Sequence, residues 1–124
     1  MNTTHTQPCI LLADDEAILL RTSEQLLTFL GYEVVTAANG HEALDMFFRN
    51  PDRFDLVMVD DQMPYVTGKE VCRKIHELQP EQKLLLCSGH AAEDKPAAGE
   101  PPKLTKPYTI GELVHILQNL LETT

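Results

Sequence analysis

The chain has 124 residues, enough for one compact domain with a single hydrophobic core. Apolar residues make up 43% and charged residues 23% of the sequence, which is ordinary globular usage and excludes a disordered or fibrous chain. The formal net charge of -9 comes without a basic block, which argues against direct nucleic-acid binding because phosphate contacts need clustered Lys and Arg.

Short β-rich apolar runs alternate with longer segments of helical period, a pattern typical of βα units and a parallel sheet. After a flexible tail over residues 1–8, one domain is predicted over residues 9–122. Strands are expected over residues 9–13, about 33–36, 56–59, 84–87 and 104–105. Helices are expected over about 16–30, between the turn at 39–40 and Pro51, over about 69–78, and from Thr109 to Leu121.

Several helix ends carry recognisable signals. Asp14-Asp15 is predicted to cap the first helix and Gly31 to end it. Thr109 with Glu112 predicts a capping box for the last helix. The inward face of the first helix is expected to carry Ile18, Leu19, Leu26, Leu27 and Leu30.

Neither a membrane segment nor a disulfide is expected. The longest apolar runs are much too short to cross a bilayer, and the first residues do not form a secretory signal, so a cytoplasmic location is expected. The three cysteines form no Cys-x-x-Cys pair, which predicts free, buried thiols.

Polar side chains end four of the five predicted strands. In an open parallel sheet the ligand site lies beyond the carboxyl ends of the strands. Asp14 and Asp15 follow the first strand, Asp60 the third, Ser88 the fourth and Lys106 the fifth. Taken alone, each residue is more often a helix cap, a turn former or a solvated charge, but their shared position at strand ends predicts that they meet in one crevice.

The residue types in this crevice suit phosphoryl transfer. Neighbouring carboxylates repel one another unless a cation joins them, and hard oxygen ligands suit Mg²⁺ or Mn²⁺. A metal and an ammonium group that neutralise phosphoryl oxygens let a carboxylate attack phosphorus. Asp60 is the best-placed nucleophile.

Four segments in order resemble the receiver domains of response regulators in two-component signal transduction, the chemotaxis regulators included. They read LLADDE from Leu11, DLVMVDDQMP from Asp55, LCSG from Leu86 and KPY from Lys106. The likeness extends over nearly the whole chain. It implies an α/β, flavodoxin-like, doubly wound sheet of five parallel strands in the order 2-1-3-4-5, with helices on both faces.

The resemblance also implies roles for these residues. Asp60 would be phosphorylated by a histidine kinase, a histidine phosphotransfer protein or a small phosphodonor. Ser88 would hydrogen-bond a phosphoryl oxygen, and Lys106 would pair with the phosphoryl group. Lys106-Pro107 would form a cis peptide, as this bond often does in the family.

A magnesium site follows from the same resemblance. Asp15, Asp60 and the backbone carbonyl of Gln62 would hold Mg²⁺, with Asp14 acting mainly through water. Asp61 is not counted among the ligands.

The chain departs from the family between its fourth and fifth strands. Lys103 stands where members carry an aromatic or other apolar switch residue. The segment over 90–102 is short and holds three prolines, so we expect a mobile loop and a fourth helix that is short or missing. The signal would then be an ordering of residues 90–103. His90 would lie at the rim of the pocket, either tuning phosphoryl lifetime or without a role.

Two other functions compete with this one. A magnesium-dependent phosphohydrolase of the haloacid-dehalogenase type needs an acid two residues after its nucleophile, and Gln62 stands there, so we expect no enzyme beyond self-catalysed phosphotransfer and autodephosphorylation. A receiver fold that acts as a phosphorylation-independent interaction module is favoured by Lys103 and opposed by the acidic residues.

With no effector domain, output would be a contact with an unknown downstream protein, a phosphorelay step or a phosphate sink. Met1 and the polar ends favour a complete single-domain protein over a piece of a hybrid kinase.

Overall fold

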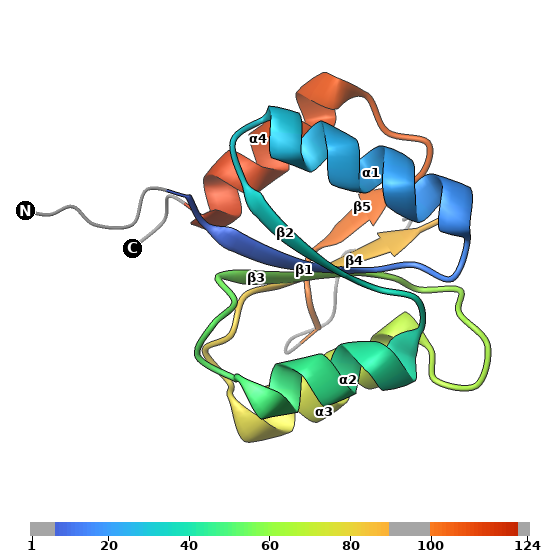
Figure 1. Cartoon of the computed structure of the whole chain (residues 1–124), viewed down its shortest axis with the longest axis vertical. Coiled ribbons are helices and arrows are strands. Elements are labelled where there is room, and N and C mark those ends of the chain that lie inside the picture. The colour runs from blue at the N-terminus through green and yellow to red at the C-terminus, as the bar shows by residue number, and fades with distance from the viewer. Residues whose placement is uncertain (1–6, 90–99, 122–124) are drawn as a thin grey trace, which may run out of the picture.

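The computed structural model describes residues 7–89 and 100–121. Within these ranges strands and helices alternate as far as β4, and the next described element is again a strand (Figure 1): β1 Cys9–Ala13, α1 Ala17–Phe29, β2 Glu33–Ala37, α2 Gly40–Arg49, β3 Leu56–Asp60, α3 Gly68–Leu78, β4 Leu84–Ser88, β5 Lys103–Thr105 and α4 Ile110–Leu121. The predicted elements are confirmed, with ends that differ by no more than one residue. The short or missing fourth helix, the ordering loop and His90 were predicted for a segment that lies largely outside the described residues.

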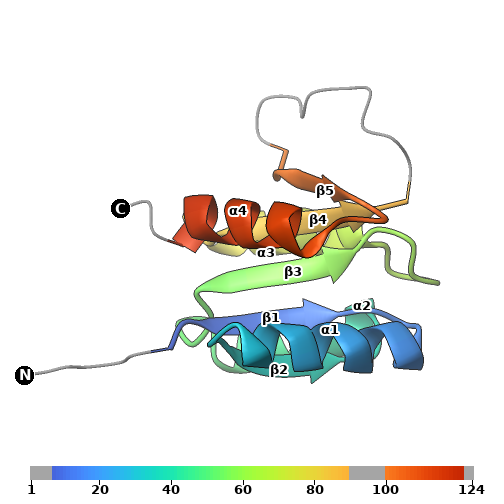
Figure 2. The ribbon, with the colours of Figure 1, turned by 90° about the horizontal axis from the view of Figure 1, so that it is seen from above.

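All five strands are parallel and follow the order β2-β1-β3-β4-β5. The expected flavodoxin-like order is therefore confirmed. Their arrows point the same way in Figure 2, so the carboxyl ends share one edge of the sheet. Ala13 lies opposite Val59, and Asp60 lies opposite Cys87, which brings the ends of β1, β3 and β4 side by side.

Helices cover both faces of the sheet, with α1 and α4 on one face and α2 and α3 on the other (Figure 1). Two separate clusters of buried side chains fill these faces. Along β1, Leu11 belongs to one cluster while Ile10 and Leu12 belong to the other. A strand buried on both faces needs apolar residues at every position, which explains the unbroken apolar runs of β1 and β3.

The start of α1 differs from the prediction. The helix begins at Ala17, and its N-cap residue Glu16 makes no side-chain capping bond. Asp14 closes the turn before the helix instead, because its Oδ1 accepts a hydrogen bond from the Glu16 N–H at 3.0 Å. Gly31 ends the helix as predicted, at a φ of 105°.

The inward face of α1 was also predicted wrongly at its first turn. Ile18 is 80% exposed and Leu19 is exposed as well, whereas Leu27 is fully buried. The first turn follows the carboxyl end of β1, so it extends past the sheet edge and has no strand beneath it (Figure 2). Helical period alone cannot locate that edge.

Other local predictions are confirmed. Thr109 Oγ1 accepts from the Glu112 N–H, and Glu112 Oε1 accepts from the Thr109 N–H, which is the expected capping box. The Lys106-Pro107 peptide is cis. All three cysteines are free and buried. In the described part of the chain, no helix combines the length and apolar character that a membrane span requires.

Candidate functional site

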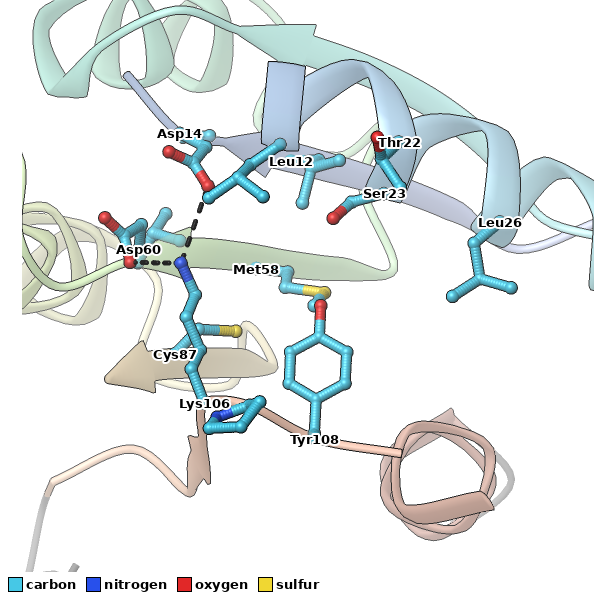
Figure 3. A pocket seen from close by; sticks show the side chains of 14 residues that line it. Leu12, Asp14, Thr22, Ser23, Leu26, Met58, Asp60, Cys87, Lys106 and Tyr108 are labelled. Carbon is cyan, nitrogen blue, oxygen red and sulfur yellow. Dashed lines mark hydrogen bonds and ion pairs between the residues drawn. The ribbon is translucent and has the colours of Figure 1, made fainter. Parts of the chain in front are cut away.

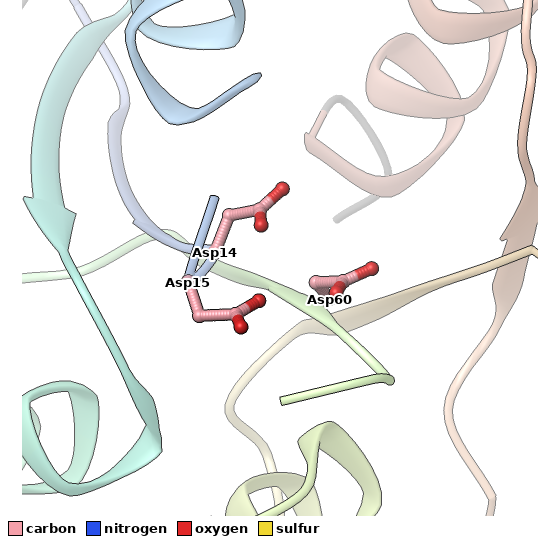
Figure 4. Close-up of side chains that lie close together, drawn as sticks. All are labelled: Asp14, Asp15 and Asp60. Atoms are coloured by element: carbon pink, nitrogen blue, oxygen red, sulfur yellow. The ribbon is translucent and has the colours of Figure 1, made fainter. Parts of the chain in front are cut away.

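Three carboxylates meet at the carboxyl edge of the sheet. Asp14 and Asp15 lie in the turn after β1, and Asp60 is the last residue of β3 (Figure 4). One carboxylate oxygen from each lies within 4.8 Å of one from each of the others. The structure thus brings together three of the predicted site residues, because β1 and β3 are neighbours in the sheet.

Lys106 reaches the same site from the segment after β5. Its Nζ donates to Asp60 Oδ1 at 2.8 Å and lies 3.6 Å from Asp14 Oδ2 (Figure 3). The Lys106 N–H donates to the Ser88 carbonyl at 2.7 Å, which ties the lysine to the end of β4. The ammonium group therefore lies between carboxylates that come from β3 and from the turn after β1.

Burial and the ion pair between Lys106 and Asp60 shift the pKa of each partner in opposite directions. Burial raises the pKa of Asp60, and the nearby Asp14 and Asp15 carboxylates raise it further, against the hydrogen bond from Lys106; the balance lies above the ordinary value. Burial lowers the pKa of Lys106, but the hydrogen bond and charge of Asp60 and the charge of Asp14 outweigh it, so this pKa is also raised.

The donor set fits a divalent cation. Three carboxylates and one ammonium group leave two formal negative charges uncompensated in one small volume, which is unfavourable without a cation. Asp14 is buried and the Asp60 side chain is only 11% exposed, while Asp15 faces solvent. Carboxylate oxygens at a partly hydrated site suit Mg²⁺, which keeps several waters when bound.

The two remaining predicted residues lie at or just after the carboxyl ends of β4 and β3. Ser88 is buried at the end of β4, opposite Thr105 of β5. Gln62 lies in the loop two residues after Asp60, and its side chain is exposed. The roles given to Ser88 and to the Gln62 carbonyl stay predictions.

One feature beside the site carried no sequence signal. A recess of about 490 Å³ opens between α1 and the segment after β5, with Asp14, Asp60 and Lys106 on its wall (Figure 3). Its other lining side chains are mostly apolar and come from both sides: Leu12, Leu19, Leu26, Met58, Cys87 and Tyr108. The recess depends on how far α1 stands from the segment after β5, which local sequence patterns do not encode.

A glycine, Gly68, also shapes the site in a way that sequence reasoning missed. Gly68, the first residue of α3, packs against the backbone of Asp60 and Asp61 so closely that no side chain fits between them. Its N–H donates to the Asp61 carbonyl at 3.1 Å. Gly68 thereby holds the loop after Asp60 against the strand end.

Comparisons with known proteins agree with this geometry. The family model described as "Response regulator receiver domain" matches residues 10–118. The crystal structure of a response regulator receiver domain protein from Clostridium thermocellum is 30% identical, with a TM-score of 0.85, covering 93% of this chain and 94% of that one. The response regulator TrrA from Thermotoga maritima, solved in complex with Mg²⁺ and BeF, is 31% identical with a TM-score of 0.83, covering 93% of this chain and all of that one.

Curated relatives are longer than this chain. The response regulator MprA of Mycolicibacterium vanbaalenii is 32% identical over 119 residues, which cover 93% of this chain and 51% of that protein. The autoinducer 1 sensor kinase/phosphatase LuxN of Vibrio campbellii is 32% identical over 117 residues, covering 92% of this chain and 14% of LuxN. The likeness thus spans about half of one relative and a small part of the other. With the sheet order and the acidic edge, these matches show that the chain belongs to the family of response regulator receiver domains of two-component systems.

Proposed function

We propose that the chain is a phosphoacceptor domain in which Asp60 takes up a phosphoryl group with the help of Mg²⁺. The observation that carries this proposal is the cluster of Asp14, Asp15 and Asp60 carboxylates with Lys106 Nζ 2.8 Å from Asp60 Oδ1. A carboxylate, a lysine and a cation site at the edge of one sheet are the components that in-line phosphoryl transfer needs.

The transfer itself exchanges one bond for another. A carboxylate oxygen of Asp60 bonds to the phosphorus of the donor, the bond from phosphorus to the donor's nitrogen or oxygen breaks, and the leaving group keeps the electron pair. Lys106 leaves its ion pair with Asp60 to pair with a phosphoryl oxygen, and Ser88 donates a hydrogen bond to another. Mg²⁺ or Mn²⁺, held by Asp15, Asp60 and the Gln62 carbonyl with Asp14 through water, would supply positive charge at the phosphoryl oxygens.

The partners in this proposal are proteins. A histidine kinase or a histidine phosphotransfer protein donates the phosphoryl group, and a downstream protein receives the signal by contact. The domain turns over no outside substrate, since Gln62 stands where a phosphohydrolase needs an acid. The cytoplasm, where histidine kinases draw on ATP and Mg²⁺, is the proposed location.

Phosphorylation by a small donor tests the proposal without a partner. The protein is incubated with phosphoramidate and Mg²⁺, and the modified residue is mapped by mass spectrometry. One phosphoryl group on Asp60 is expected, with none on Asp60→Asn. Asp61→Asn is the matched control, because it removes the adjacent carboxylate and should keep the modification.

Chelation tests the metal separately: excess EDTA should stop the reaction, and added Mg²⁺ or Mn²⁺ should restore it. Modification at another residue would overturn the assignment to Asp60. An unmodified wild-type protein would favour the phosphorylation-independent interaction module, which Lys103, at the start of β5, also favours.

A further inference from the structure

The loop between β3 and α3 holds an aromatic residue in a costly backbone conformation. Tyr65 has a φ of 69°, and among the described residues no other non-glycine residue has a positive φ. The Val66 N–H donates to the Pro64 carbonyl at 2.7 Å, so Tyr65 is the central residue of a γ-turn. With positive φ this turn is rare and strained, and a glycine or an asparagine would adopt it at lower cost.

The turn cannot relax, because the residues that follow it are held in place. Val66 packs on the start of α2, where a Cβ on Gly40 would lie only 2.6 Å from the Val66 carbonyl oxygen. Gly68 lies against the backbone of Asp60 and hydrogen-bonds the Asp61 carbonyl. The packing of the loop thus imposes the conformation on Tyr65.

The Tyr65 ring contributes no packing that would offset this cost. Its side chain is 100% exposed, so it buries no apolar surface in the domain. A large, rigid side chain with a polar tip is the kind that carries binding energy at protein interfaces. An imposed strained conformation that presents such a ring to solvent indicates a binding role.

The position of the loop identifies the kind of partner. Tyr65 follows β3, so it lies at the sheet edge that carries Asp60, whose side chain is only 11% exposed. A protein that brings a phosphoryl group to Asp60 must lay its surface over the loops at this edge. A downstream partner has no such need and can bind any surface.

Exposed apolar side chains lie at both edges of the sheet. Ile18 in the first turn of α1 and Ile110 at the start of α4 also follow strands, and both are exposed. At the opposite edge Phe29, Phe48 and Leu78 are exposed in the last turns of α1, α2 and α3. What sets Tyr65 apart is full exposure on an imposed turn beside Asp60.

We propose that Tyr65 is a contact residue for the protein that donates the phosphoryl group to Asp60, and that it contributes to the choice of donor. This inference rests on the proposed function, because it needs Asp60 to be the acceptor. It goes further by assigning recognition of a protein donor, as distinct from the chemistry, to one residue of the loop after β3.

The test compares two classes of donor on the same variants. Tyr65→Asn removes the ring and tolerates the backbone conformation, Tyr65→Phe keeps the ring, and Phe48→Asn is the control at the opposite edge. Each is phosphorylated with phosphoramidate and Mg²⁺. A panel of autophosphorylated histidine kinases and phosphotransfer proteins is tested on the wild type, and the protein that transfers fastest is chosen. Each variant is then phosphorylated by that protein.

With the protein donor, Tyr65→Asn should lower the second-order rate of transfer about ten-fold or more, whereas Tyr65→Phe and Phe48→Asn should match the wild type. With phosphoramidate all variants should react alike. The urea midpoint of Tyr65→Asn should equal or exceed that of the wild type, because the strained turn is relieved.

Four results would overturn the proposal. Tyr65→Asn could accept from the protein donor as fast as the wild type, or it could slow equally with both donors, which would make the loop a support for Asp60 only. A lowered urea midpoint would show that the ring stabilises the fold. If phosphoramidate phosphorylates the wild type but no protein of the panel does, the proposal has no protein donor for Tyr65 to contact. A wild type that phosphoramidate leaves unmodified would instead refute the proposed function.

Discussion

Replacing Gly68 by alanine tests whether the close packing of α3 on β3 holds the site. A Cβ at Gly68 would meet the carbonyl oxygen of Asp60 and would lie 2.8 Å from both the Asp61 Cα and a methyl group of Leu86. Two of these three contacts are with backbone at the strand end, which cannot yield as a flexible side chain does. Gly68→Ala should therefore destabilise the domain.

The expected size follows from two opposing effects. Overpacking costs about 1–3 kcal/mol, and the backbone contacts place this site near the upper value. Gly to Ala in a helix recovers at most about 1 kcal/mol. The net loss is about 2 kcal/mol, which for a domain of this size lowers the Tm by roughly 8 °C.

Gly111 supplies the matched control. It is exposed in the first turn of α4, and a Cβ there would find no atom nearer than Thr109 Oγ1 at 3.8 Å. Gly111→Ala should thus leave the stability unchanged or raise it by up to about 1 kcal/mol. Thermal and urea unfolding followed by circular dichroism measure both variants. The packing argument is refuted if Gly68→Ala melts at or above the wild type, or if both variants lose stability equally.

Three further predictions concern charged groups and thiols. The pKa of Asp60 is raised in the fold, so the contribution of the Asp60 side chain to stability is present below its ordinary pKa and is lost as the pH rises through the folded pKa. Asp60→Asn should therefore have a higher urea midpoint than the wild type at neutral pH, and the difference between the two midpoints should shrink on acidification. An advantage that grows on acidification would contradict the sign. Lys106→Met should cost about 2 kcal/mol in metal-free buffer, between the values of exposed and buried pairs, and Mg²⁺ should recover part of it. The pKa of Lys106 is raised, so the stability difference between Lys106→Met and the wild type should close in alkali, as the pH rises through the folded pKa of Lys106. A Tm deficit that depends on neither Mg²⁺ nor pH would contradict an ionic cause. Burial raises the pKa of Cys72 and of Cys87 to about 12. Iodoacetamide should therefore label neither thiol at pH 8 until urea unfolds the domain. Labelling at the same rate without urea would show that both thiols are accessible in the folded domain.

The alternation of apolar and helical segments predicted the elements because that signal is local. The run from Leu56 to Val59 is apolar at successive positions, as a strand covered on both faces requires, and the structure buries it on both. The order of the strands in the sheet came from the family resemblance and not from this pattern. Ile18 shows the limit of periodicity, since the pattern cannot tell that the first turn of α1 extends past the sheet.

The sequence by itself determined the residue types at the carboxyl ends of the strands, and with them the acidic edge that includes Asp60, because those ends must share one edge in a parallel sheet. Only the tertiary structure decided the distance from Lys106 to Asp60, the contact of Gly68 with the strand end and the imposed turn at Tyr65. These features arise where elements distant in the chain pack together. Local propensity constrains neighbours along the chain, whereas strand register and helix docking set the ångströms between such elements.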